Sequence, residues 1–107
     1  IGGGAPKRCE PKSPVAVLEV HGRADELVPI AGGALGGGLP QRAMVPSVRA
    51  TLDGWARVDR CGQPDAAGRR RCKAGAVELW MLPGGHWPEV GAGFGERVWQ
   101  WLATQHK

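Results

Sequence analysis

The chain has 107 residues, of which 42% are hydrophobic, and a formal net charge of +4 at pH 7. This length suits at most one domain, and the apolar fraction excludes an intrinsically disordered chain. No apolar run reaches the roughly 18 residues of a transmembrane helix, so we expect no membrane partner.

Strand-like and helix-like segments alternate along the chain. Residues 14–20, PVAVLEV, form a continuous apolar and β-branched run that is typical of a strand covered on both faces. Residues 46–60 predict a helix with Ser47 as its N-cap, residues 76–82 a second strand, and residues 94–106 a second helix. This alternation favours an α/β fold with a parallel sheet and helices packed on it.

Other segments are predicted with less regular structure. The Gly-rich stretch 32–38 shows no periodicity and is expected to be an irregular connection.

Each predicted helix carries an apolar stripe that should face the sheet. These stripes consist of Val48, Leu52, Trp55 and Val58 in the first helix and of Phe94, Val98, Trp101 and Leu102 in the second.

Each predicted strand leads into a loop that carries a titratable residue. HGRADELVP follows the first strand and contains Asp25, and PGGHWP follows the second and contains His86. Because parallel strands end at the same edge of a sheet, Asp25 and His86 should meet there. A carboxylate bonded to one imidazole nitrogen would leave the other nitrogen to act as a general base. The alternative for Asp25 is a carboxylate that only caps a turn, and the alternative for His86 is a solvent-facing loop histidine. His21 is expected to form structural hydrogen bonds.

A basic loop lies between the first helix and the second strand. Arg69–Arg71 stand between Cys61 and Cys72, and a disulfide would close this loop, contribute roughly 2–3 kcal/mol and indicate an oxidising compartment. Two reduced thiols are the alternative. No stacking aromatics accompany the arginines, so we expect no nucleic-acid partner. Cys61, Cys72 and His86 have unsuitable spacing for zinc, and we expect neither a metal nor a cofactor.

The two loop motifs resemble the C-terminal part of α/β-hydrolase esterases, in the group of polyhydroxybutyrate depolymerases, feruloyl esterases and acetyl xylan esterases. The group pattern is roughly H-G-x-x-D-x-x-V-P after one strand and G-G-H-x-W-P after the next, here HGRADELVP and GGHWP. The resemblance covers about residues 9–105. It implies that residues 1–107 are the C-terminal portion of one α/β-hydrolase domain, whose N-terminal half with the serine nucleophile is absent.

The resemblance also implies roles for individual residues. Asp25 would be the acid and His86 the base of a Ser–His–Asp triad, in the chain order of α/β-hydrolases. Cys61 and Cys72 would match paired cysteines in some members. Trp87 would either line an acyl or aromatic pocket or cover the histidine loop. The implied protein is a secreted or periplasmic enzyme that hydrolyses polyhydroxyalkanoate, feruloyl or acetyl esters without a cofactor.

The chain departs from the group pattern in two respects. His86 is followed directly by Trp87, where the group often has one residue between them. The chain also has no G-x-S-x-G elbow, because its only serines, Ser13 and Ser47, do not lie between a strand and a helix. The chain alone is therefore expected to be inactive. The alternative function is a non-catalytic module that binds an acidic partner through Arg69–Arg71.

Overall fold

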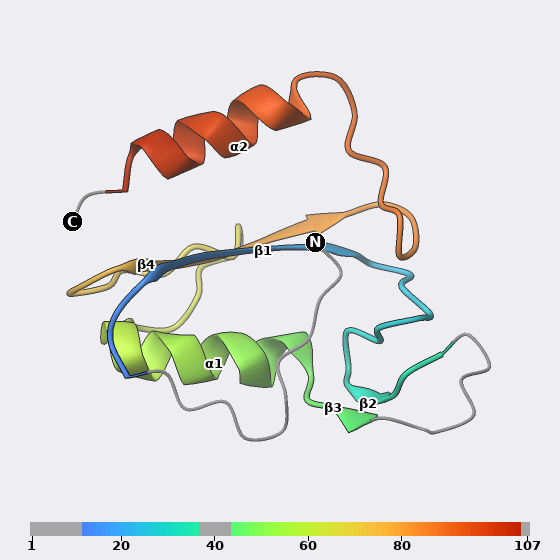
Figure 1. Ribbon diagram of the computed structural model, residues 1–107, viewed down its shortest axis with the longest axis horizontal. Helices are drawn as coiled ribbons and strands as arrows, with labels where there is room; N and C mark the ends of the chain where they lie inside the picture. The colour runs from blue at the N-terminus through green and yellow to red at the C-terminus, as the bar shows by residue number, and fades with distance from the viewer. Residues whose placement is uncertain (1–11, 37–43, 106–107) are drawn as a thin grey trace.

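The computed structural model describes residues 12–36 and 44–105, in which a two-stranded parallel sheet lies between two helices (Figure 1). The end of the predicted second helix and the end of the predicted Gly-rich connection fall outside the described residues. The element order confirms the predicted alternation and an α/β architecture. In the described residues, no helix is long and apolar enough to cross a membrane.

The central sheet consists of β1 (Ala16–Gly22) and β4 (Ala76–Leu82). The two strands pair in parallel along their whole length. The limits of β4 match the prediction, whereas β1 begins and ends two residues later than predicted, so that His21 lies inside the strand. The apolar pattern ends at Val20, but pairing with β4 continues the extended backbone beyond it.

Helix α1 (Val48–Asp59) covers one face of this sheet. Ser47 is its N-cap, as predicted, and the Ser47 hydroxyl accepts a hydrogen bond from the backbone N–H of Ala50 at 3.0 Å. Buried residues of the helix pack against Val77 of β4 and form the core. The predicted stripe is confirmed at its first two positions, which are buried, and at Trp55, which is partly buried against the same core. At the end of the stripe, Ala56 is buried in the core and the predicted Val58 is not part of it. The core residues are Val48, Leu52, Ala56 and Val77.

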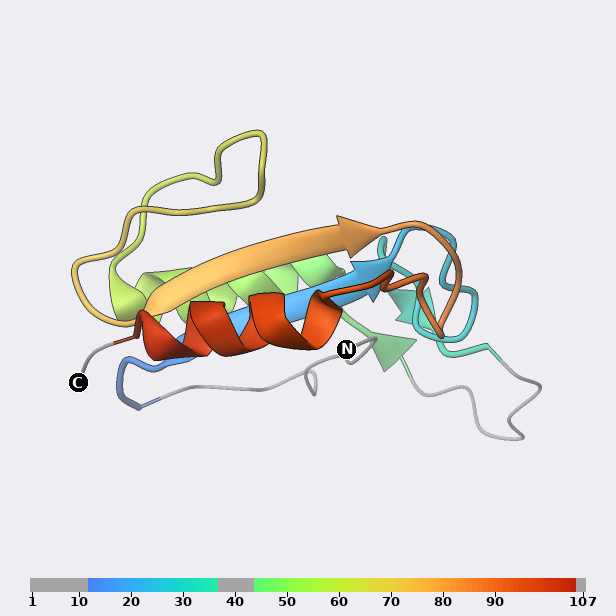
Figure 2. The ribbon, with the colours of Figure 1, turned by 90° about the horizontal axis from the view of Figure 1, so that it is seen from above.

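Helix α2 (Phe94–Ala103) lies over the opposite face of the sheet, and Figure 2 shows it beside β1. The prediction that its apolar stripe is packed inward is wrong in part, because α2 has no buried residue and Leu102 is 51% exposed. A two-stranded sheet is too narrow to cover the stripe. An apolar groove of about 400 Å³ remains between α2 and β1.

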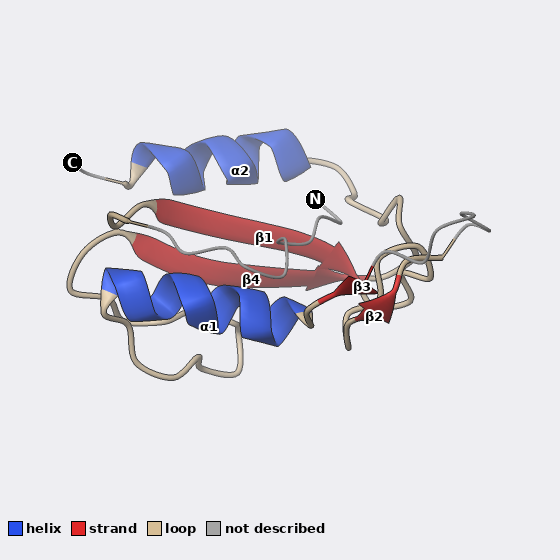
Figure 3. Cartoon of the chain, turned by 60° about the horizontal axis from the view of Figure 1, so that its bottom comes forward, coloured by secondary structure: helices blue, strands red, loops and turns tan. Residues whose placement is uncertain are grey.

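Two further features connect the main elements. Strands β2 (Gly33–Ala34) and β3 (Met44–Val45) pair antiparallel near the carboxyl ends of β1 and β4 (Figure 3). The prediction of irregular structure is wrong at Gly33–Ala34, because a two-residue backbone pairing leaves no side-chain periodicity in the sequence. The predicted disulfide joins Cys61 to Cys72 and closes the basic loop.

Candidate functional site

The loop after β1 holds Asp25 in a tight turn at the carboxyl edge of the sheet. Asp25 is buried, and its Oδ1 accepts hydrogen bonds from the backbone N–H groups of Leu27 at 2.9 Å and Val28 at 2.8 Å. An aspartate favours such a turn because its short side chain reaches the backbone two and three residues ahead. These two bonds fix the carboxylate and leave Oδ2 for other partners.

The loop after β4 brings His86 to that free oxygen. His86 Nδ1 lies 3.1 Å from Asp25 Oδ2, although the two residues are 61 positions apart. The two loops are joined by a backbone bond from Ala24 N–H to the Gly84 carbonyl at 3.0 Å. Gly22 makes this close approach possible, because a Cβ at this position would collide with the carbonyl oxygens of the loop after β4.

The charge of Asp25 depends on these contacts. Burial alone would raise the pKa of Asp25. Hydrogen bonds from the backbone of its turn and from His86 outweigh burial and hold the pKa of Asp25 below its usual range. Asp25 is therefore a carboxylate at neutral pH. Its Oδ2 accepts the Nδ1–H bond, and this directs the other ring nitrogen of His86, Nε2, away from the pair. The His86 side chain is 28% exposed, so solvent reaches part of the ring.

His21 also belongs to this site, although its position there was not predicted from the sequence. It is fully buried, and its Nε2 lies 2.8 Å from the Val28 carbonyl oxygen and 3.3 Å from Asp25 Oδ2. Its Nδ1 lies 2.9 Å from Glu19 Oε1. The predicted hydrogen-bonding role is confirmed, but the contact with Asp25 is new. The two-residue spacing of Glu19 and His21 indicates a shared face of the strand.

Trp87 lies at the surface beside His86. Its side chain is 87% exposed, and the ring meets the His86 ring edge to face, with the centroids 5.5 Å apart. Trp87 lines neither the groove under α2 nor the cavity beside β4. The Trp87 ring therefore contacts the His86 side chain, while most of its surface is open to solvent.

The basic loop uses most of its charge within the molecule. Arg70 forms a 2.7 Å ion pair with Asp53, and only 5% of the Arg70 side chain is exposed. Arg69 lies 3.8 Å from Asp65. The backbone N–H of Arg69 also bonds Asp65, and this is the main cause of the lowered pKa of that carboxyl. Two of the three arginines predicted to bind an acidic partner therefore have internal carboxylate partners.

The described residues show neither a metal centre nor a nucleophile beside the pair. They contain no group of three or more His, Cys, Asp or Glu side chains that could hold a metal ion. Ser47 caps α1, and no serine among residues 12–36 and 44–105 is hydrogen-bonded to His86. The pair can fix the tautomer of the His86 ring and accept a proton at Nε2.

Comparison with known proteins assigns no family, because no family model, curated protein or solved structure matches the chain.

Proposed function

We propose that the chain is the C-terminal part of a serine esterase of the α/β-hydrolase fold. The observation that carries this proposal is the 3.1 Å contact between His86 Nδ1 and the buried carboxylate of Asp25. The parallel pairing of β1 and β4 supports it, since both loops leave the same edge of the sheet, where α/β proteins hold their ligands. The chain order, Asp25 before His86, is that of α/β-hydrolases.

In the complete enzyme, a serine from outside this chain would attack the ester carbonyl. Nε2 of His86 takes the serine proton and then gives it to the leaving alcohol, so that an acyl-enzyme forms. A water molecule that loses its proton to the same nitrogen then hydrolyses the acyl-enzyme. Asp25 holds the ring in the required tautomer and stabilises the imidazolium.

The surroundings of the pair suit this division of roles. The lowered pKa of Asp25 keeps it ionised, so it remains an acceptor throughout the reaction. Two backbone bonds fix the Asp25 carboxylate, while His86 stays partly exposed to the substrate side. In this proposal the exposed indole of Trp87, next to the His86 ring, would contact an apolar acyl group. This contact suits polyhydroxyalkanoate and feruloyl esters better than acetyl esters.

The proposed location is secreted or periplasmic. The disulfide between Cys61 and Cys72 supports it, because such bonds persist mainly in oxidising compartments. The alternative function, binding of an acidic partner through Arg69–Arg71, has less support, since Arg69 and Arg70 already pair with Asp65 and Asp53.

The proposal is tested by His86→Ala in the complete enzyme, with p-nitrophenyl esters of short acids as substrates. We expect kcat to fall by about 10⁴-fold or more, as in serine hydrolases that lose a triad member. Glu89→Gln, an exposed change in the same loop, is the matched control and should leave kcat unchanged. A His86→Ala enzyme with the activity of the Glu89→Gln enzyme would contradict the proposal.

A further inference from the structure

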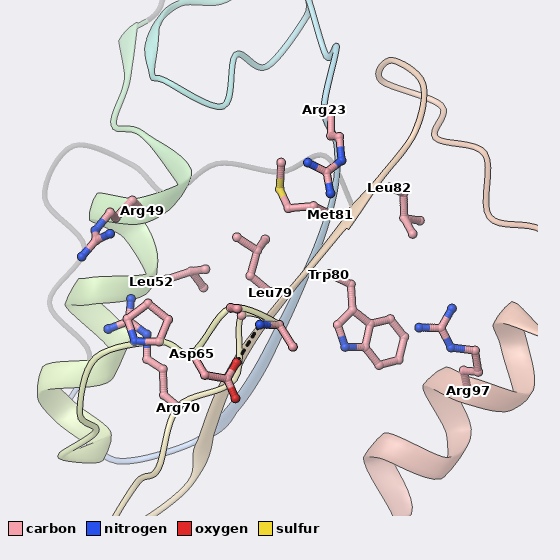
Figure 4. Close-up of a pocket in the computed structure, with 14 residues that line it drawn as sticks. Arg23, Arg49, Leu52, Asp65, Arg70, Leu79, Trp80, Met81, Leu82 and Arg97 are labelled. Carbon is pink, nitrogen blue, oxygen red and sulfur yellow. Dashed lines mark hydrogen bonds between the residues drawn. The ribbon is translucent and has the colours of Figure 1, made fainter.

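A cavity of about 500 Å³ lies along the outer edge of β4, the edge that does not pair with β1 (Figure 4). We call it the edge cavity. Four arginines line it, namely Arg23, Arg49, Arg70 and Arg97, together with a single carboxylate, Asp65. Its volume falls in the range of ligand-binding pockets, and its charge favours an anion. The proposed esterase chemistry makes no use of it.

The positive charge of the edge cavity is only partly compensated. Arg49 and Arg70 share one carboxylate, Asp53, at 3.7 Å and 2.7 Å. Among the described residues, neither Arg23 nor Arg97 forms an ion pair. The guanidinium groups of Arg23 and Arg97 are therefore open to an anionic ligand, whereas Arg49 also donates a hydrogen bond to Gln63 Oε1 at 3.1 Å.

These cations lie on both faces of the strand. Figure 4 shows Arg49 and Arg70 on the side of α1, and Arg97, carried by α2, on the other side of β4. The Arg97 guanidinium carbon lies 4.7 Å from the centre of the Trp80 ring. This cation–π contact restrains the Arg97 side chain before any ligand arrives, which lowers the entropic cost of binding.

The backbone of β4 offers a second binding feature at the same place. The N–H of Leu79 points away from β1 and donates to the Gly68 carbonyl at 3.0 Å, and Arg69 forms an antiparallel bridge with Glu78. Backbone groups alternate in direction along a strand, so those of Met81 point to the same side as those of Leu79. Residues 68–69 thus pair with this edge at Glu78 and Leu79. The next backbone groups that point outward along the edge are those of Met81, which also lines the edge cavity.

We propose that the edge cavity binds an acidic peptide segment in extended conformation, which pairs with β4 at Met81. Successive side chains of an extended segment point to opposite faces. Neighbouring glutamates could therefore reach Arg49 on one face and Arg97 on the other. Main-chain hydrogen bonds would supply affinity and the carboxylates specificity, as in other proteins that bind a peptide at a strand edge.

The first test measures binding of a fluorescein-labelled peptide, Thr-Glu-Glu-Glu-Glu-Thr, to the complete protein by fluorescence anisotropy. Arg49→Gln and Arg97→Gln should each weaken binding by about three- to fivefold, because each removes one ion pair with the peptide at an exposed position. Arg71→Gln removes the same charge from an exposed position that does not line the cavity and should change affinity by less than about twofold. Equal affinities for all three variants would overturn the proposal.

The second test separates strand pairing from charge alone. A peptide of the same sequence with N-methyl groups at alternate residues keeps its carboxylates but loses backbone donors on one side. The methyl groups can stand on the odd or on the even residues of the peptide. One of these two placements should weaken binding by about tenfold, because it removes the N–H groups that donate hydrogen bonds to the edge of β4. Tetragalacturonate carries as many carboxylates as the peptide has glutamates. Equal binding of both methylated peptides, or binding of tetragalacturonate as tight as that of the parent peptide, would show that a polyanion site is present and would overturn the peptide proposal.

Discussion

Replacement of Asp25 by asparagine is the most informative change at the candidate site. The amide oxygen of the new side chain can still accept the backbone bonds from Leu27 and Val28. The amide NH₂ group then takes the place of Oδ2, so that a donor faces His86 Nδ1 at 3.1 Å and His21 Nε2 at 3.3 Å. His86 would have to turn its lone pair towards this amide group and place its proton on Nε2. That tautomer cannot accept a proton from a serine.

The expected effect of Asp25→Asn on catalysis follows from the tautomer. Loss of the correct tautomer costs about 10⁴-fold in kcat in serine hydrolases whose geometry is otherwise intact. The assay is the initial rate of p-nitrophenyl ester hydrolysis by the complete enzyme, with Asp65→Asn as a control at an exposed turn aspartate. A loss below about tenfold for Asp25→Asn would refute the assignment of Asp25 as the triad acid.

The same variant has a second readout in the acid stability of the fold. The pKa of Asp25 is lowered in the folded state, so its stabilising effect is complete above the unfolded-state pKa and is lost as the pH falls through the lower, folded-state pKa. Urea unfolding from neutral pH down to about pH 2 should therefore show a smaller loss of stability in Asp25→Asn than in the parent. Parallel pH profiles for both proteins would contradict the lowered pKa.

Three further predictions concern the residues that support the pair. Gly22→Ala should lower kcat, because its Cβ would push the loop of His86 away. Gly54→Ala on α1, where a Cβ would meet only the end of the Arg57 side chain at 3.9 Å, should instead raise the unfolding free energy by up to about 1 kcal/mol. Steady-state kinetics and urea unfolding of both variants test these two expectations. His21→Phe leaves the partly buried Val28 carbonyl without its partner and should cost about 1–3 kcal/mol in the free energy of unfolding, together with a fall in kcat. A Cys61→Ser/Cys72→Ser double variant should lose roughly 2–3 kcal/mol in urea unfolding while its kcat remains that of the parent, since the disulfide closes a distant loop.

Local patterns account for the parts of the fold that the sequence predicts well. The alternating run 76–82 and the Ser47 cap depend on residues adjacent in the chain, and both are observed as predicted. The proximity of Asp25 and His86 follows from one further step, the shared edge of two parallel strands.

The remaining features depend on contacts between segments far apart in the sequence. The extra residues at the end of β1 are extended because β4 pairs with them, and this pairing places His21 beneath Asp25. The apolar stripe of α2 indicates a buried face, but the sheet offers only two strands to cover it. The edge cavity combines Arg23, Arg49 and Arg97 from three separate segments, so no sequence motif could indicate it.

Covalent labelling of the complete enzyme tests whether Asp25 and His86 activate a serine. A fluorophosphonate reacts with a serine only when a neighbouring base activates it, and intact mass with peptide mapping identifies the labelled residue. We expect labelling of one serine outside residues 1–107 and loss of this label in His86→Gln. An unlabelled parent enzyme, or a His86→Gln enzyme labelled at the rate of the parent, would show that Asp25 and His86 do not activate a serine.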